Sequence, residues 1–320
     1  MSTTPTTLRD PAETAVAQCL ALESNESCAI VTDDKREPIG EALYDVASEI
    51  TDDAVIVRYP PGTTHGSEPP DPVAAAMAGA DVVLAPTTKS LSHTRARTEA
   101  NEAGARVATL PGITQEVFTT GLDADYELIA DHCADVREQV DDADEIRVTA
   151  PAGTDITFDV GGHDFLSDTG IVHEPGVMSN LPAGEVFVSP ESASGTFVVD
   201  GTMMPHGLLE DDQTLAFEVE DGLVTDISDD DIRETVESAA EEVGDAARNL
   251  AELGIGTNVA VTELVGSVLL DEKAGGTVHI AIGDDAGIGG DVEAPIHLDG
   301  IIRGPTVYVD GEEVDLPQSE

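Results

Sequence analysis

The sequence predicts an α/β domain with a parallel sheet, followed by a mostly antiparallel β (α+β) domain. In the first half, short runs of buried, β-branched character alternate with amphipathic helical segments, which is typical of a parallel sheet with helical crossovers. In the second half, alternating strands follow one another across glycine turns, with one long helix. A length of 320 residues, of which 40% are hydrophobic, is enough for two domains with their own cores.

The first half carries eight alternating segments, which predict a doubly wound domain. Helical patterns cover residues 11–22, 38–50, 71–80 and 92–104. Strand patterns cover residues 27–34, 53–59, 81–87 and 105–112. No helix opens with GxGxxG, and the loop PPGTTHGSEPP lacks the lysine of a phosphate-binding loop. The sequence therefore gives no support to a nucleotide-binding function.

The character of the sequence changes in the acidic run DDADE, near residues 140–146. Residues 147–162 then predict two strands about a Pro-Ala-Gly turn, and further strands follow to about residue 228. A helix is expected from about 231 to 253, with strand pairs after it. We therefore expect a doubly wound domain at 1–143 and a β-rich, metal-binding catalytic domain at 144–320.

The charge is strongly acidic, because 14 Lys and Arg oppose 65 Asp and Glu, a formal net charge of −51. Nucleic acid and anionic membranes are therefore excluded as expected partners. No apolar run reaches the roughly 20 residues that span a bilayer, and no signal peptide is recognisable, so we expect a cytoplasmic protein. A folded, lysine-poor acidic surface favours a halophilic protein, since the screening length falls to about 3 Å at 1 M salt.

Candidate metal ligands occur only in the second half. In EAPIHLDG, His297 and Asp299 lie two positions apart, so in a strand both side chains leave the same face. In GTVHIAIG, His279 is expected on the strand face opposite Val278 and Ile280, with small residues beside it.

Two glutamates complete the candidate set. Glu185 follows a Pro-Ala-Gly turn at the start of a strand pattern. Glu252 is expected at the end of the 231–253 helix, where a carboxylate opposes the helix dipole and favours a nearby cation. Taken singly, each of the five residues has a structural explanation, such as an exposed acid or a core histidine. Together they have the composition of a dinuclear hydrolytic site, in which carboxylates bridge two cations and imidazoles bind them.

The segments NLPAGEV, AELGIGTN, DEKAGGTVHIAIG and IHLDG, in this order, resemble the aminopeptidase T family of metallopeptidases. SLSHTRARTEANEAGARVATLPGIT is similar to the first domain of that family. The resemblance implies a metal-dependent aminopeptidase, a hydrolase that cleaves small peptides at the N-terminal residue, and a possible homodimer. It also implies two divalent ions, Zn, Co or Mn. Its implied metal ligands are Glu185, Glu252, His279, His297 and Asp299.

In the peptidase mechanism, Glu252 is the expected bridge between the ions, and a metal-activated water attacks the peptide carbonyl. Glu272, just upstream of His279, is the candidate proton shuttle to the leaving amine. The sequence departs from the family at Asp284–Gly290, which lacks the tyrosine thought to assist catalysis in its better-known members. Peptidase activity is therefore less well supported than metal binding.

Two alternatives remain open. His279, His297 and Asp299 have the composition of a facial triad that holds Fe(II), and the sequence is similar, through the same superfamily, to dihydroxypyridine ring-cleaving dioxygenases. The two enzymes differ in whether Glu185 and Glu252 also bind metal. The other alternative is a metal- or ligand-binding protein that has lost catalysis.

Overall fold

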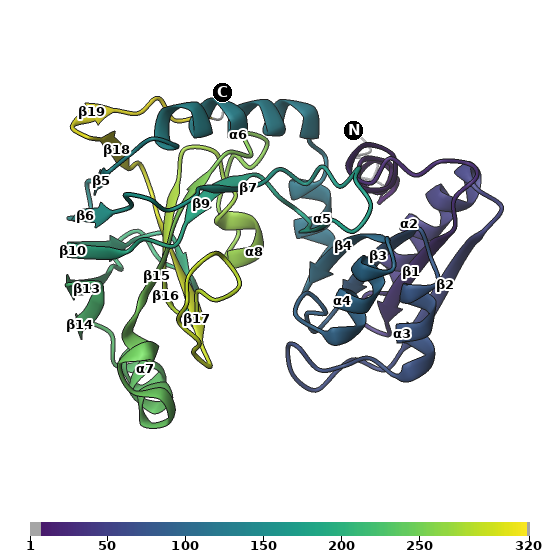
Figure 1. Cartoon of the computed structure of the whole chain (residues 1–320), viewed down its shortest axis with the longest axis horizontal. Helices are drawn as coiled ribbons and strands as arrows, with labels where there is room; N and C mark the ends of the chain where they lie inside the picture. The colour runs from purple at the N-terminus through teal and green to yellow at the C-terminus, as the bar shows by residue number, and fades with distance from the viewer. Residues whose placement is uncertain (1–7, 319–320) are drawn as a thin grey trace. The chain divides into compact units, whose positions relative to one another are not determined.

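The computed structural model describes residues 8–318, which form two compact units (Figure 1). Unit 1 contains the chain up to Ala130 together with Asp168–Ala183, and unit 2 contains Asp131–Ser167 and the chain from Gly184 onward. The chain thus passes between the units three times, whereas the sequence predicted a single boundary at 143/144. The difference arises because residues 168–183 add a strand to the sheet of unit 1.

Unit 1 is the predicted α/β domain with a parallel sheet. Its strands are parallel in the order β2-β1-β3-β4-β8, and they comprise β1 (Cys28–Asp33), β2 (Ala54–Tyr59), β3 (Val82–Thr87), β4 (Arg106–Pro111) and β8 (Met178–Asn180). Every residue of β1 and β3 is buried, which is the pattern of strands covered on both faces.

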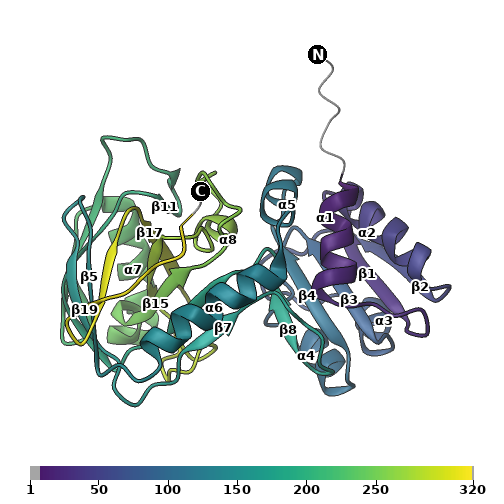
Figure 2. The ribbon, with the colours of Figure 1, turned by 90° about the horizontal axis from the view of Figure 1, so that it is seen from above.

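Helices cover both faces of this sheet (Figure 2). They are α1 (Arg9–Glu13), the π-helical turn η1 (Thr14–Cys19), α2 (Glu37–Ile50), α3 (Asp71–Ala78), α4 (Arg95–Glu102), α5 (Gln115–Gly121) and the first part of α6 (Tyr126–Val140). Helices α3 and α4 share one core cluster with alternate residues of β1 and β3, such as Val31 and Val83. Helix α2 packs beside α1 and η1. The crossovers match the predicted alternation of helix and strand.

Unit 2 contains two seven-stranded sheets, and the predicted antiparallel, β-rich character is confirmed. The first sheet has the order β14-β13-β10-β6-β5-β18-β19 and comprises β5 (Glu145–Thr149), β6 (Asp155–Asp159), β10 (Ser192–Val199), β13 (Leu215–Glu220), β14 (Leu223–Ile227), β18 (Thr306–Val309) and β19 (Glu312–Glu313). The second has the order β12-β11-β17-β16-β15-β9-β7 and comprises β7 (Leu166–Asp168), β9 (Glu185–Val188), β11 (Thr202–Met203), β12 (Gly207–Leu208), β15 (Leu250–Gly256), β16 (Val278–Gly283) and β17 (His297–Ile302).

The core of unit 2 lies between its two sheets. Gly300 of β17 allows the close approach of Val199 of β10, since a Cβ added to Gly300 would lie 2.4 Å from Val199 Cγ2. In the first sheet, the rings of Phe197 and Phe217 stack with centroids 4.4 Å apart. Helix α8 (Val268–Asp271) lies beside the other face of the second sheet (Figure 1). The second sheet therefore has one face in the core and one face free to carry polar groups.

The segment that contains Glu252 differs from the sequence prediction. Helix α7 (Asp230–Val243) is capped at its N-terminus by Asp229, whose side chain accepts a hydrogen bond from Ile232 N. It is followed by the 3-10 turn η2 (Gly244–Arg248) and then by strand β15. Glu252 thus lies in a strand, and the expected helix end at residue 253, with its opposing dipole, is wrong. The short apolar run around Glu252 is buried throughout, and such a run has no period that distinguishes helix from strand.

Candidate metal centre

The five predicted ligands project from one face of the second sheet of unit 2. The register pairs Glu252 and Asp299 with Ala281, and paired residues point to the same side of a sheet. His279 lies two residues from Ala281, and His297 lies two residues from Asp299, so both share that face. The four strands β9, β15, β16 and β17 are adjacent in the sheet, which brings distant parts of the chain together.

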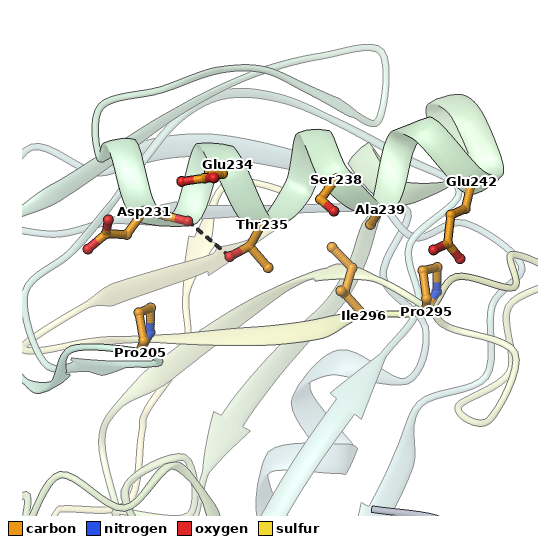
Figure 3. A pocket seen from close by; sticks show the side chains of 9 residues that line it. All are labelled: Pro205, Asp231, Glu234, Thr235, Ser238, Ala239, Glu242, Pro295 and Ile296. Atoms are coloured by element: carbon orange, nitrogen blue, oxygen red, sulfur yellow. Dashed lines mark hydrogen bonds between the residues drawn. The ribbon is translucent and has the colours of Figure 1, made fainter. Parts of the chain in front are cut away.

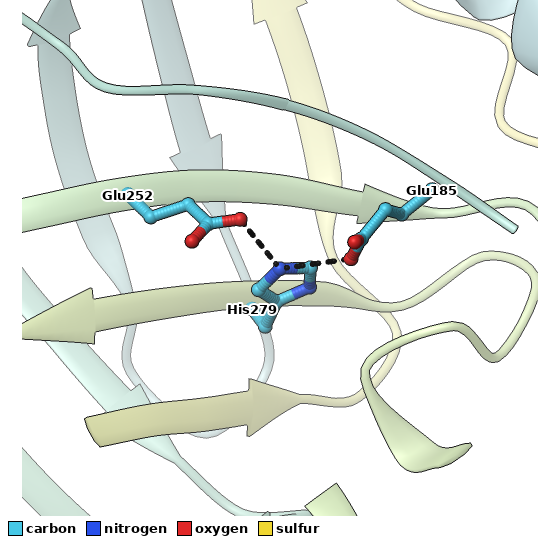
Figure 4. A group of neighbouring side chains, drawn as sticks. All are labelled: Glu185, Glu252 and His279. Atoms are coloured by element: carbon cyan, nitrogen blue, oxygen red, sulfur yellow. Dashed lines mark hydrogen bonds and ion pairs between the residues drawn. The ribbon is translucent and has the colours of Figure 1, made fainter. Parts of the chain in front are cut away.

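Glu185 reaches the same face through its pairing with Gly256 at the start of β9. It forms one group of potential ligands with Glu252 and His279, whose donor atoms all lie within 4.8 Å of one another. His279 Nε2 lies 3.3 Å from Glu252 Oε1 and 3.4 Å from Glu185 Oε2. Figure 4 shows the imidazole ring between the two carboxylates. All three side chains are buried.

Glu252 also belongs to a second group, with His297 and Asp299. Its other oxygen, Oε2, lies 3.3 Å from His297 Nε2, and Asp299 Oδ1 lies 3.3 Å from the same nitrogen. One carboxylate therefore joins both imidazoles. The His297 side chain is 33% exposed, against 1% for His279, so the cluster opens toward solvent at His297.

Lys273 is a member of the cluster that the sequence reasoning missed. Its ammonium group forms ion pairs with Glu185 and with Glu272, the latter at 2.8 Å from Oε1, and its side chain is only 4% exposed. Glu272, the predicted proton shuttle, is therefore the charge partner of a buried lysine. A signal was present in the sequence, because lysine occurs only at positions 35, 89 and 273 and is rare in a chain with 65 acidic residues.

The buried charges shift the pKa values of the cluster. Burial raises the pKa of Glu185 to about 8, against the charges of Lys273 and His279. Burial also favours the neutral form of Glu252, but hydrogen bonds from the two histidines outweigh it and hold the pKa of that carboxyl well below its usual range. Burial likewise raises the pKa of Glu272.

Both imidazoles are shifted toward the protonated form. Burial lowers the pKa of His279, but the hydrogen bond to Glu252 and the charges around it dominate and raise that pKa to about 9. For His297 the charge of Asp299 outweighs burial and raises the pKa to about 12. The same pair holds the pKa of Asp299 below its usual range against the effect of its burial. Protons on the histidines thus balance the carboxylates unless a cation does so.

Residues outside the sheet hold His297 in place. His297 Nδ1 donates to the Asp284 carbonyl oxygen at 2.7 Å, which turns Nε2 toward the cluster. The next residue, Asp285, is buried and accepts from Ser189 Oγ, Asn249 Nδ2 and Val292 N. This carboxylate ties the loop that follows β16 to the neighbouring segments. Its hydrogen-bond donors Ser189, Asn249 and Val292 are not candidate ligands, so its effect is on the loop.

A third group of potential ligands lies apart from the sheet face. His206, Asp229 and Asp231 surround the start of α7, and His206 Nε2 lies 3.1 Å from Asp229 Oδ1. Asp231 also lines a pocket between α7 and residues 295–296, which contains none of the five predicted ligands (Figure 3). Capping of α7 already accounts for Asp229, so this group needs no metal.

The sheet-face cluster fits a divalent transition metal. Two imidazoles and a carboxylate are the donor set of facial-triad iron sites, and carboxylates with imidazoles also suit zinc and manganese. Within residues 8–318, the buried atoms Glu185 Oε2 and His279 Nδ1 have no hydrogen-bond partner. Buried carboxylate oxygens without donors are costly unless a cation or water satisfies them.

Comparison with known proteins decides the family. The family model for 2,5-dihydroxypyridine 5,6-dioxygenase matches residues 16–315, which span both units. The chain belongs to this family. Membership in the 2,5-dihydroxypyridine 5,6-dioxygenase family supports a metal-dependent enzyme of the oxidoreductase class, for which the clusters above are candidate ligand sets.

Two solved structures share the fold of this family member. The 2,5-dihydroxypyridine dioxygenase of Pseudomonas putida KT2440 is similar with a TM-score of 0.79 and 18% identity, covering 98% of this chain and 97% of that one. AmpT of Thermus thermophilus is similar with a TM-score of 0.65 and 18% identity, covering 97% and 99%. No curated protein matches the sequence.

The prediction of a metallo-aminopeptidase is wrong. The family model and the more similar of these two structures both favour the dioxygenase alternative, an oxidoreductase, over a peptide hydrolase. The resemblance to aminopeptidase T holds at the level of the shared fold. The motifs misled because the peptidase and the dioxygenase hypotheses rely on the same candidate residues. No helix in the described part of the chain is long and apolar enough to cross a membrane.

Proposed function

We propose that this chain is a ring-cleaving dioxygenase whose substrate is a small dihydroxylated pyridine or a closely related aromatic diol. The observation that carries the proposal is the family match over residues 16–315. A 5,6-dioxygenase inserts both atoms of dioxygen and breaks the ring bond between C5 and C6. Two imidazoles and one carboxylate on one face of a sheet are the protein groups that such chemistry requires.

We assign metal binding to His279, His297 and Asp299, with Glu252 in contact with both imidazoles. Bound Fe(II) with open coordination positions would supply dioxygen activation and a point of attachment for a substrate hydroxyl group. The residues of the chain orient that ion. Glu252 fixes the two rings relative to each other, and the carbonyl of Asp284 selects the His297 tautomer with Nε2 free for the ion.

The substrate is expected to approach past His297, where the cluster is open to solvent. The opposite side of the cluster is closed, because His279 and Lys273 are buried. A closed, carboxylate-rich interior excludes bulk water behind the ion. The proton shuttle to a leaving amine, which the peptidase hypothesis assigned to Glu272, has no place in ring cleavage.

The test uses protein loaded anaerobically with Fe(II) in concentrated KCl, with 2,5-dihydroxypyridine as the probe. We expect oxygen uptake on an electrode, equal in amount to the loss of the pyridine absorbance band. His297→Ala and Asp299→Ala should each abolish the uptake, because each removes a ligand. His206→Ala is the matched control and should keep full activity, since it removes a histidine from the third group only.

An iron-loaded protein that consumes no oxygen with 2,5-dihydroxypyridine, its positional isomers or catechol would contradict the proposal. Loss of activity in His206→Ala with retention in His297→Ala would move the centre to the start of α7. A homodimer and the exclusion of nucleic acid stay predictions, and gel filtration in high salt tests the first of them.

A further inference from the structure

Strand β2 forms one edge of the sheet of unit 1 (Figure 2). Within residues 8–318 its backbone pairs only with β1, so the N–H and C=O groups on its outer side have no partner in the sheet. Two of its residues are large exposed hydrophobics, Val55 at 48% and Ile56 at 37%. An exposed apolar edge of this kind is a template for pairing with another strand.

The other sheet edges of the described chain are short or covered. Strands β7, β8, β12 and β19 have two or three residues each, and short edge strands recruit partners poorly. The remaining edge strand, β14, is bridged at Leu223 to Asn249. By contrast, β2 has the six residues AVIVRY, of which only Arg58 is charged. This edge is therefore the one best suited to pair with another chain.

The apolar edge continues into a groove between β2 and α2. Ile56 and Arg58 line this groove together with Tyr44 of α2, and its volume is about 510 Å³. The acids Glu41 and Asp45 of the same helix lie at its border. A tyrosine and an exposed aliphatic side chain inside a polar rim are typical of protein interfaces.

We propose that β2 pairs antiparallel with β2 of a second copy of this chain, with Ile56 of each copy facing Ile56 of the other. The partner is a second copy because the strand is complementary to itself in this register. Val55 then lies opposite Val57 of the second copy, and Ala54 lies opposite Arg58. The one long charged side chain of the strand thus meets the smallest side chain, and each exposed valine meets another valine.

Charge favours the same register. Arg58 forms ion pairs only with exposed acids of its own chain. Asp52 and Asp53, just before Ala54, are exposed, and within residues 8–318 neither forms an ion pair. The pairing brings Arg58 of each copy beside these two acids of the other, which fixes the register more than it adds affinity. In concentrated salt, a screening length of about 3 Å at 1 M suppresses the general repulsion between two acidic chains.

The experiment measures the mass of the full chain in concentrated KCl by sedimentation velocity. We expect a dimer for the wild type. Ile56→Glu and Ile56→Lys should each be monomeric, because like charges then lie directly opposite each other across the twofold axis. A one-to-one mixture of these two variants should recover the dimer, since opposite charges then face each other.

Leu128→Glu is the matched control, because it introduces the same charge at an exposed leucine of α6. This variant should remain a dimer, and circular dichroism shows whether each variant is folded. A monomeric wild type would mean that β2 does not pair with a second copy, and the proposal would be wrong. A dimer that Ile56→Glu leaves intact, or a mixture of folded variants that stays monomeric, would overturn it as well.

A cross-link tests the register without a new charge, and it decides the question if the charged variants do not fold. Oxidation of Ile56→Cys should give a disulfide-linked dimer, because position 56 faces itself. The native cysteines Cys19, Cys28 and Cys133 are buried and do not compete. Val55→Cys should cross-link about tenfold less, because position 55 faces position 57 of the other copy.

Equal cross-linking of the two cysteine variants, or none in Ile56→Cys, would contradict the register. Neither measurement needs a metal ion or a substrate. The pairing of β2 can therefore hold even where the oxygen-uptake test of the proposed function fails.

Discussion

Gly254 lies directly opposite His279 in the antiparallel pairing of β15 with β16. A Cβ atom at position 254 would lie 2.1 Å from both Cε1 and Nε2 of the imidazole, closer than side-chain atoms can approach. The backbone at Gly254 is not in the left-handed region, so the requirement for glycine is one of space. The absence of a side chain at Gly254 makes room for the imidazole of His279 on the neighbouring strand.

Gly254→Ala should displace the His279 ring and abolish tight metal binding. The fold is expected to persist, because the change occurs on the polar face of the sheet and not in the core. Metal titration followed by circular dichroism measures both effects. Gly62→Ala is the control, since a Cβ there meets only ordinary contacts of 3.5 Å or more. Unchanged affinity in Gly254→Ala would show that His279 does not bind the ion.

Metal binding should release protons. With pKa values raised to about 9 and about 12, His279 and His297 are both protonated at pH 7.5 before the ion binds. A metal ion binds the neutral imidazole and displaces those protons. We expect about two protons released per ion and an affinity that rises as the pH increases toward 9. Calorimetry in two buffers of different ionisation enthalpy counts the protons, and affinity independent of pH would contradict the assignment.

Asp285 should control the loop whose Asp284 carbonyl contacts His297. Asp285→Ala leaves the donors of Ser189, Asn249 and Val292 without their acceptor. We expect a loss of about 3 kcal/mol in the free energy of unfolding, together with weaker metal binding. Asp291→Ala, in the same loop but exposed, is the control and should change stability by less than about 0.5 kcal/mol. Urea titration measures both variants.

The pair Glu26–Arg106 should make the stability of unit 1 depend on pH. Arg106 donates to both oxygens of Glu26 at 2.8 Å, and this pairing lowers the pKa of Glu26 from 4.5 in spite of partial burial. Because the folded-state pKa is lowered, the stabilisation is present above pH 4.5 and is lost as the pH falls through the folded value.

Glu26→Gln is therefore expected to cost about 2 kcal/mol at pH 7. The difference from the wild type should shrink progressively below pH 4.5. Chemical unfolding of both proteins at constant high salt between pH 3 and pH 7 gives this comparison. Glu23→Gln, a neighbouring exposed acid, serves as the reference. If the difference in the free energy of unfolding stays constant over this pH range, the charge of Glu26 does not contribute to stability.

The sequence predicted the fold class from local patterns, whereas the five ligand candidates came from their residue types and from the resemblance to the aminopeptidase T family. Strand alternation placed His297 and Asp299 on one face, and the register of β16 and β17 confirms it. The strand of His279 was predicted for the same reason. These patterns could not predict the reaction type, because the hydrolase and the dioxygenase hypotheses use the same candidate ligands on the same fold.

The features that the sequence predicted wrongly or not at all depend on long-range contacts. Glu252 was placed at a helix end because β15 is buried on both faces and carries no alternation. Lys273 was passed over because its partner Glu185 is 88 positions away, and only the folded sheet brings them together. The short strand β8 has three residues, too few for a periodic signal.

Strand β8 has a consequence for how the protein is made. It completes the parallel sheet beside β4, yet it follows β5 and β6, which belong to unit 2. During translation the first sheet therefore keeps an open edge until residue 180 has left the ribosome, and an open edge invites pairing with another chain. A fragment cut at residue 143 would keep that edge exposed permanently and should aggregate, whereas one that also carries residues 168–183 regains the missing neighbour.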